Sequence, residues 1–91
     1  MKTRAILSVL GEDRVGIVAR VTRALAESGA NIEDIRQTII SGIFSMTMLV
    51  TVDEEAAPFD KVQAALAETA AELDVQITLQ REDVFRAMHR V

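Results

Sequence analysis

Two glycines frame the stretch of this sequence that has the clearest chemical potential. Gly11 and Gly16 flank a short polar segment, which follows an apolar strand-like run and precedes an amphipathic helical pattern. A glycine-flanked turn between a strand and a helix directs free backbone N–H groups toward one point, and that point lies at the positive end of the helix dipole. The turn is therefore suited to hold a small anion such as a carboxylate.

The same turn also has a purely structural interpretation. Asp13 would cap the helix by accepting a hydrogen bond from the N–H near Gly16, and the glycines would serve only the turn. A third interpretation fails, because Ile17 and Val18 stand where a phosphate-binding loop of this glycine spacing needs a lysine and a hydroxyl residue. A carboxylate site and a capped helix start remain as alternatives.

The rest of the chain offers little to catalysis or to metal binding. It has no cysteine and one histidine, His89, which has no second metal ligand nearby in the sequence. No nucleophile stands beside a base, so general acid–base or covalent catalysis has no candidate pair. The neighbouring acids at 33–34 and 54–55 are expected to be solvated. We expect no metal, no cofactor and no enzymatic activity.

Composition sets the class of protein. The 91 residues are 49% hydrophobic, which predicts one domain, 1–91, with a single core. The formal net charge of −4 gives no electrostatic reason to bind nucleic acid or an anionic membrane. The apolar run near the N-terminus is too short for a signal peptide or a membrane span. These features indicate a soluble cytoplasmic protein.

Hydrophobic periodicity predicts the elements that must position the turn. Alternation predicts strands at 3–10, 31–40, 43–53 and 75–80, and helical spacing predicts helices at about 15–28 and from Pro58 to 73. Gly29 suits the left-handed position after the first helix, and Ser41-Gly42 is a short hairpin signal. Residues 82–90 are expected to form a short C-terminal helical extension.

The order βαββαβ favours one topology. Two right-handed crossovers place both helices on one face of a four-stranded antiparallel sheet of order 4-1-3-2, an α+β ferredoxin-like sandwich with the short C-terminal helix added. The opposite face should be mixed, since it receives both hydroxyl and aliphatic side chains. Its expected members are Ile6, Ser8, Leu10, Thr47, Leu49, Thr51, Gln76 and Thr78.

A family resemblance rests on these motifs together. The turn reads Gly11-x-Asp13-x-x-Gly16-Ile17-Val, and Gly29-x-Asn31-Ile32 closes the helix and opens the second strand. This opening resembles that of ACT domains, the small-molecule-sensing modules of amino-acid metabolism, and the likeness extends over the whole chain. It is closest to small proteins that consist of little else, and similar openings occur in glycine-cleavage repressor-like regulators.

The resemblance implies a function and a site. ACT domains bind amino acids at this turn, usually across a dimer interface, and regulate a metabolic partner. By analogy, the turn N–H groups would bind the ligand carboxylate, Asp13 would take the α-ammonium group, and Asn31 of a neighbouring subunit would close the site. Many ligand-binding members have proline where Val15 stands. The implied ligand residues are Gly11, Asp13, Val15, Gly16, Ile17, Asn31 and Ile32.

Two other functions are compatible with the predicted topology. An acylphosphatase-like hydrolase has a glycine-rich loop, an arginine inside the helix and a strand asparagine, a set that Gly11, Arg20 and Asn31 loosely resemble. A protein–protein interaction module without a ligand is the second. RNA recognition would need exposed aromatic residues where this sheet has Ser8, Thr47 and Thr51.

Self-association is expected from the predicted sheet edge. The strand 31–40 would lie at an edge and is long, with isoleucines only partly interrupted by Glu33, Asp34 and Arg36. Long apolar edges are normally covered or paired. We expect a homodimer or a larger even assembly, with Val84, Phe85 and Met88 of the C-terminal helix covering part of the sheet or of a partner.

Overall fold

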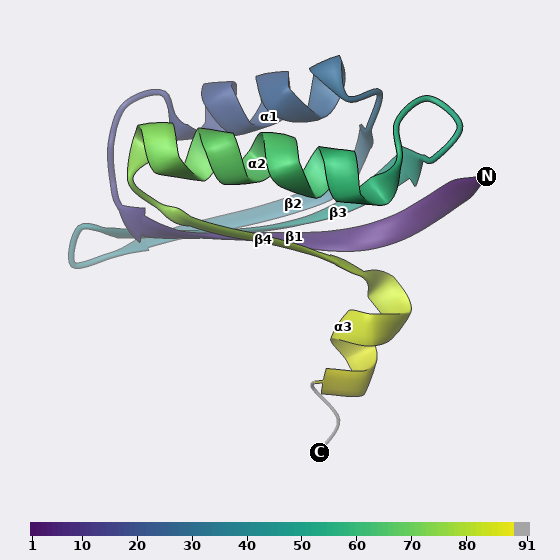
Figure 1. Ribbon diagram of the computed structural model, residues 1–91. Helices are drawn as coiled ribbons and strands as arrows, with labels where there is room; N and C mark the ends of the chain where they lie inside the picture. The colour runs from purple at the N-terminus through teal and green to yellow at the C-terminus, as the bar shows by residue number, and fades with distance from the viewer. Residues whose placement is uncertain (89–91) are drawn as a thin grey trace.

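Helices and strands follow one another in the predicted order (Figure 1). The structure is a computed structural model, and it describes residues 1–88. The strands are β1 (Lys2–Glu12), β2 (Asn31–Ile40), β3 (Ile43–Asp53) and β4 (Gln76–Arg81); the helices are α1 (Ile17–Glu27), α2 (Phe59–Leu73) and α3 (Glu82–Met88). His89 and the end of the predicted extension lie outside the described residues. Within 1–88 no helix is both long and apolar enough to span a membrane.

The sheet has the predicted topology. Its order is β2-β3-β1-β4, which is the expected order read from the other edge, and every neighbouring pair is antiparallel. β1 and β3 form the centre and pair along their whole length, from Lys2 opposite Asp53 to Glu12 opposite Ile43. β2 is therefore an edge strand, and the ferredoxin-like βαββαβ fold is confirmed.

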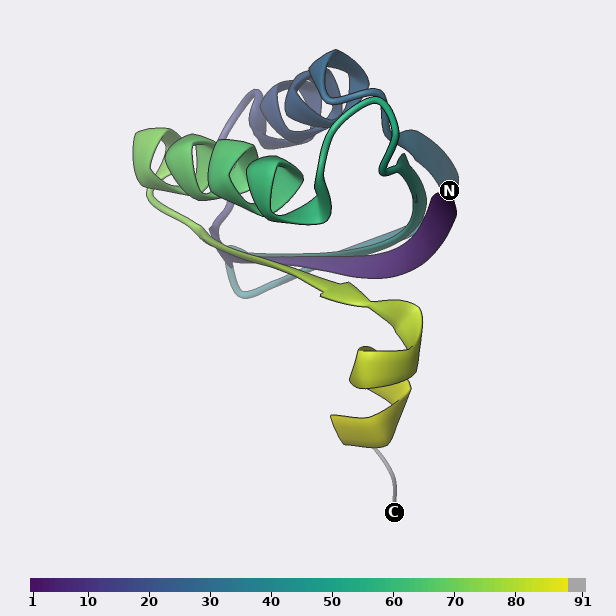
Figure 2. The same cartoon turned by 45° about the vertical axis from the view of Figure 1, so that its right-hand side comes forward.

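Both long helices cover one face of the sheet and enclose the core (Figures 1 and 2). Strand side chains alternate between this face and the other, which explains why every second residue is buried in the middle of β1 and along β3. The core is almost wholly aliphatic, as the scarcity of aromatic residues predicts. Its buried members are Ala5, Leu7, Val9, Ile17, Val21, Leu25, Phe44, Met46, Met48, Val50, Val52, Phe59, Val62, Leu66 and Leu79.

The chain reverses where the sequence signals indicated. Gly29 has φ +75°, the left-handed conformation predicted for the residue after α1. Ser41 and Gly42 both have positive φ, so the β2–β3 hairpin turns in the way that matches strand twist. Pro58 caps α2 and the helix begins at Phe59, one residue later than predicted.

Polar contacts fasten the start of β1 to the loop after β3. The Thr3 hydroxyl donates to the Glu54 carboxylate, and Arg81 Nη2 donates to the same carboxylate at 3.1 Å. The bond from Thr3 and the charge of Arg81 hold the pKa of Glu54 below its ordinary value of 4.5. The stability that these contacts give is present above that value and is lost as the pH falls through the lowered pKa.

Candidate functional site

The turn between β1 and α1 lies about two residues later in the sequence than predicted. β1 continues through Gly11 to Glu12, so only residues 13–16 connect the strand to the helix. We call this segment turn 13–16. The Asp13 N–H donates to the Gly42 carbonyl at 2.9 Å. The turn thus begins beside the β2–β3 hairpin and runs back from there to the start of α1.

Gly11 has a packing role in this arrangement. A Cβ atom on Gly11 would lie 2.7 Å from Val75 Cγ1 and 3.2 Å from Val75 Cα, distances that real Cβ atoms do not tolerate without a shift. The glycine therefore allows β1 to lie close to the segment that enters β4. This places Gly11, one of the predicted ligand residues, in a strand and not in the turn.

The start of α1 offers backbone donors that no side chain of the described chain occupies. Gly16 precedes the helix with φ 91°, and no side chain caps this end. The first bond closed by the helix runs from Arg20 N–H to the Gly16 carbonyl at 3.0 Å, so the helix itself supplies no acceptor for Ile17, Val18 or Ala19. The first turn also contains no acidic residue, so the positive end of the dipole is not neutralised from within the helix.

The alternative in which Asp13 caps α1 is wrong for this structure. Its side chain makes no capping bond to the helix. Asp13 is exposed, as are Val15 and Gly16, whereas Ile17 is buried in the core. A Cβ atom added to Gly16 would meet no atom within 4 Å, so open space lies in front of the turn. Asp13, Val15 and Gly16 are therefore exposed on this turn, with open space in front of Gly16.

The other two predicted ligand residues lie at the opposite end of α1. Asn31 and Ile32 begin β2 and line a groove of about 540 Å³ between α1 and the sheet edge. Asn31 Nδ2 contacts the Glu33 carboxylate at 3.4 Å, and Thr51 donates to the same carboxylate at 2.9 Å. An 11-residue helix is about 16 Å long, so one chain does not bring Asn31 to Gly16.

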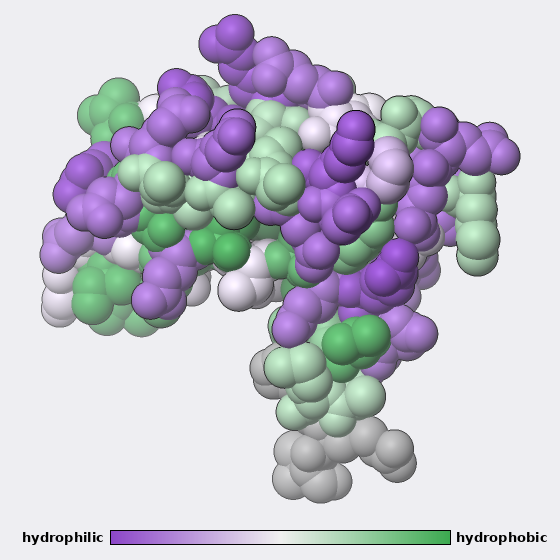
Figure 3. All heavy atoms as spheres, viewed as in Figure 1, coloured by the Kyte–Doolittle hydropathy of each residue, from purple (hydrophilic) through white to green (hydrophobic). Residues whose placement is uncertain are grey.

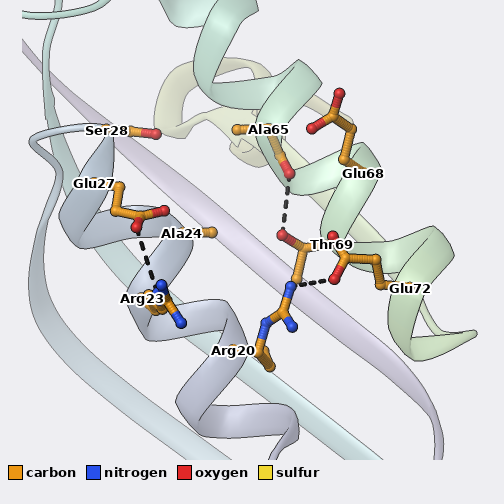
Figure 4. Close-up of a pocket in the computed structure, with 9 residues that line it drawn as sticks. All are labelled: Arg20, Arg23, Ala24, Glu27, Ser28, Ala65, Glu68, Thr69 and Glu72. Carbon is orange, nitrogen blue, oxygen red and sulfur yellow. Dashed lines mark hydrogen bonds and ion pairs between the residues drawn. The ribbon is translucent and has the colours of Figure 1, made fainter.

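A second groove, of about 370 Å³, lies between α1 and α2 (Figure 4). Arg20 projects from α1 into this groove and pairs with Glu72 of α2, and Arg23 pairs with Glu27 at 3.4 Å. The arginine that an acylphosphatase-like site requires is thus engaged on the outer surface of the helix layer. The structure does not bring Gly11, Arg20 and Asn31 into one site.

One polar arrangement was not anticipated from the sequence, and it lies at the free edge of β2. Asp34 Oδ1 accepts from the Ile35 N–H at 2.8 Å and from Arg36 Nη1 at 2.7 Å, while Arg36 Nη1 also donates to the Ile35 carbonyl at 3.0 Å. Two side chains, and not a neighbouring strand, therefore satisfy the backbone groups of Ile35. A periodicity analysis treats Asp34 and Arg36 only as charges on an edge.

Comparison with known proteins adds family evidence to this geometry. The profile of the ACT domain family matches residues 3–80. A UPF0237 protein of Methanopyrus kandleri is 48% identical over 89 residues, which are 98% of this chain and 99% of that protein.

Solved structures show the same likeness. An ACT domain protein from Streptococcus pneumoniae superposes with a TM-score of 0.80 at 37% identity, covering 96% of this chain and 98% of that one. A putative glycine cleavage system transcriptional repressor shares the fold with a TM-score of 0.80 at 23% identity, over 89% of this chain and 46% of the other.

Proposed function

The chain belongs to the ACT domain family of regulatory small-ligand-binding domains, and we propose that it senses an amino acid or a similar small carboxylate at a site shared between two copies. The observation that carries the proposal is the uncapped start of α1 behind Gly16. Backbone donors at a helix N-terminus bind carboxylates well, because the dipole adds to the hydrogen bonds. The exposed Asp13 carboxylate beside them suits an α-ammonium group.

The proposed site needs a second copy, because Asn31 and Gly16 lie a helix length apart in one chain. β2 provides the means, since its outer edge bears the Asp34–Ile35–Arg36 arrangement. In an antiparallel pair centred on Ile35, the two copies exchange N–H···O bonds at this residue, and these replace the bonds that Asp34 and Arg36 make to its backbone in a single copy. Asp34 then lies opposite Arg36 of the partner subunit, and Arg36 opposite the partner subunit's Asp34. The edge is therefore self-complementary in charge.

The same pairing brings the two halves of the site together. Counting outward from Ile35, Asn31 of the partner subunit falls beside residues 38–40 at the far end of β2. Turn 13–16 begins at that end, where Asp13 bonds to Gly42. In this pairing the partner's Asn31 lies at the same end of the sheet as turn 13–16. We infer a homodimer, or a larger even assembly, with two equivalent sites that each combine one turn and one Asn31.

A role in regulation, and not in catalysis, follows from this arrangement. The site consists of backbone donors, one carboxylate and one amide, and we assign it no nucleophile or proton-transfer pair. Ligand binding across the edge would stabilise one assembly over another and so alter how the domain contacts a metabolic partner in the cytoplasm. If no ligand binds, the same surfaces describe a protein–protein interaction module.

A thermal-shift screen of the twenty amino acids and related carboxylates tests the proposal. A ligand of so few atoms is expected to bind with a micromolar to millimolar dissociation constant. At a hundredfold excess over that constant it adds about 2.7 kcal/mol of stability, which raises the Tm of a domain this size by roughly 10 °C or more. If no compound raises the Tm at concentrations of tens of millimolar, the protein is not an amino-acid sensor, and the interaction-module function is favoured.

A further inference from the structure

β4 is the second edge strand of the sheet, and the view of Figure 1 looks onto it. It spans Gln76–Arg81, and its partner within the sheet is β1 alone. In Figure 3, hydrophobic atoms are visible along this strand, below the hydrophilic surface of α2. An edge strand presents a row of backbone N–H and C=O groups on which another strand can add, so natural sheets protect their edges.

The register of the sheet shows which backbone groups of β4 point away from it. Successive residues of an antiparallel strand direct their N–H and C=O groups to opposite sides. In β2, Ile35 directs its groups outward, because the side chains of Asp34 and Arg36 bond to them. This alternation continues through β3 and β1 in the observed registers. The residues of β4 with outward groups are therefore Ile77, Leu79 and Arg81.

Gln63 of α2 occupies the middle one of these three positions. Its side-chain Nε2 donates to the Leu79 carbonyl at 2.7 Å. In a strand pair, Leu79 would exchange two bonds with the residue opposite, one from its N–H and one to its carbonyl. The Gln63 carboxamide therefore lies where an incoming strand would place its own N–H group.

We propose that Gln63 closes the β4 edge to β2 of another copy, and so restricts sheet pairing to β2 with β2. β2 is the strand to exclude, because it is the other edge of the same sheet and has ten residues, against six in β4. A contact between β2 and β4 is heterologous. Each added copy would again expose one edge of each kind, so the assembly would not close and would grow into filaments.

The charges of the two strands do not prevent this contact. An antiparallel pair centred on Leu79 and Ile35 places Gln80 opposite Asp34 and Thr78 opposite Arg36. No like charges meet in these two pairs, whereas many edges are protected by charge repulsion. An incoming strand must instead displace the Gln63 carboxamide from its acceptor. The bond from Gln63 is thus the feature that makes this edge differ from β2.

The test is sedimentation velocity on variants that lack the Gln63 donor. Gln63→Met keeps the length of the side chain and Gln63→Ala shortens it, and both residues suit an exposed helix position. We expect the weight-average mass of each variant to rise with protein concentration, to at least about twice that of the wild type. Gln63→Lys is the matched control. Its ammonium group can donate to the same carbonyl, so this variant should keep the wild-type mass.

Gln37→Pro identifies the incoming strand. By the same alternation, the Gln37 N–H points outward from β2, where proline is tolerated but blocks the addition of another strand. Combined with Gln63→Met, it should abolish the growth in mass. The proposal rests on the proposed function only for the pairing of β2 with β2, and Gln37→Pro alone measures that pairing separately.

Circular dichroism confirms that each variant is folded. The proposal is supported if mass grows in Gln63→Met and Gln63→Ala, and if Gln37→Pro removes this growth. It is overturned if either folded variant keeps the wild-type mass at every concentration, or if Gln63→Lys grows equally. Growth that persists in the presence of Gln37→Pro would also overturn it, because β2 would then not be the incoming strand.

Discussion

Gly16→Val is expected to abolish the stabilisation of this protein by its ligand. The new side chain would project into the open space in front of the α1 N-terminus, because a Cβ atom there meets nothing within 4 Å. In the proposed site, the ligand carboxylate occupies that space to reach the backbone donors. We expect the dissociation constant to rise by more than about a hundredfold, so that the ligand concentrations of the screen no longer stabilise the variant. Titration calorimetry with the best ligand of the screen measures it.

Gly42→Val is the matched control for backbone strain. Gly42 has φ +77°, close to the φ of +91° at Gly16, and a Cβ atom there also meets nothing within 4 Å. Each substitution therefore costs about 1–2 kcal/mol through the left-handed conformation, and more for a branched side chain. Only Gly16→Val should lose the ligand. Equal loss in both variants would attribute the effect to strain in the turns, and no loss in either would remove turn 13–16 from the site.

Asp34→Arg is expected to separate the copies that pair through β2. The substitution places two guanidinium groups opposite each other on both sides of Ile35, where the wild type has two opposite-charge pairs. Like charges across antiparallel strands destabilise the pair, and the edge loses its complementarity. Sedimentation velocity should show an assembly of half the mass, with a dissociation constant raised about tenfold or more.

The double variant Asp34→Arg/Arg36→Asp is the control, because it exchanges the charges and restores opposite signs across the pair. We expect it to reassemble. Ile35→Cys gives an independent measurement, since the chain has no other cysteine and the pairing places two copies of position 35 within disulfide reach. Failure of the double variant to reassemble, together with no disulfide dimer on mild oxidation, would show that the copies do not pair about Ile35.

The sheet and its covering helices were predictable because burial imposes a period on the sequence. Leu7 and Val9 alternate with Ser8 in β1, and Met46 and Met48 alternate with Thr47 in β3. The residue types of each strand therefore indicate which of its faces is buried. Gly29 and Gly42 marked reversals that only a positive φ allows. Chain order and crossover handedness then selected the observed topology.

Gly11 shows where such reasoning fails. A glycine near the end of an apolar strand has two meanings, a turn or a close approach of another segment, and its neighbours in sequence do not separate them. The approach is made by Val75, which is 64 positions away in the sequence. The strand was therefore predicted to end at residue 10 and not at Glu12, and the helix was predicted from about residue 15 but begins at Ile17.

The composition of the proposed site was predictable only in part, because the proposal combines distant segments. The sequence motifs proposed Asp13, Gly16 and Asn31 as ligand residues but gave no distance between them, and the length of α1 keeps Asn31 from the turn within one chain. The contact that aligns the turn, from Asp13 to the Gly42 carbonyl, uses backbone atoms alone. A contact between backbone atoms does not require particular residue types, so the sequence does not indicate it.

Mixing two defective variants tests the shared site most directly. Gly16→Val blocks the space in front of the turn, and Asn31→Ala removes the side-chain amide. Each variant alone should therefore fail to bind the ligand. After subunit exchange, a mixed dimer contains one site built from an intact turn and an intact Asn31. With random exchange, calorimetry should recover roughly a quarter of the wild-type sites. If the mixture binds no ligand although mixed dimers form, or if Asn31→Ala binds like the wild type, the site is not shared between two copies.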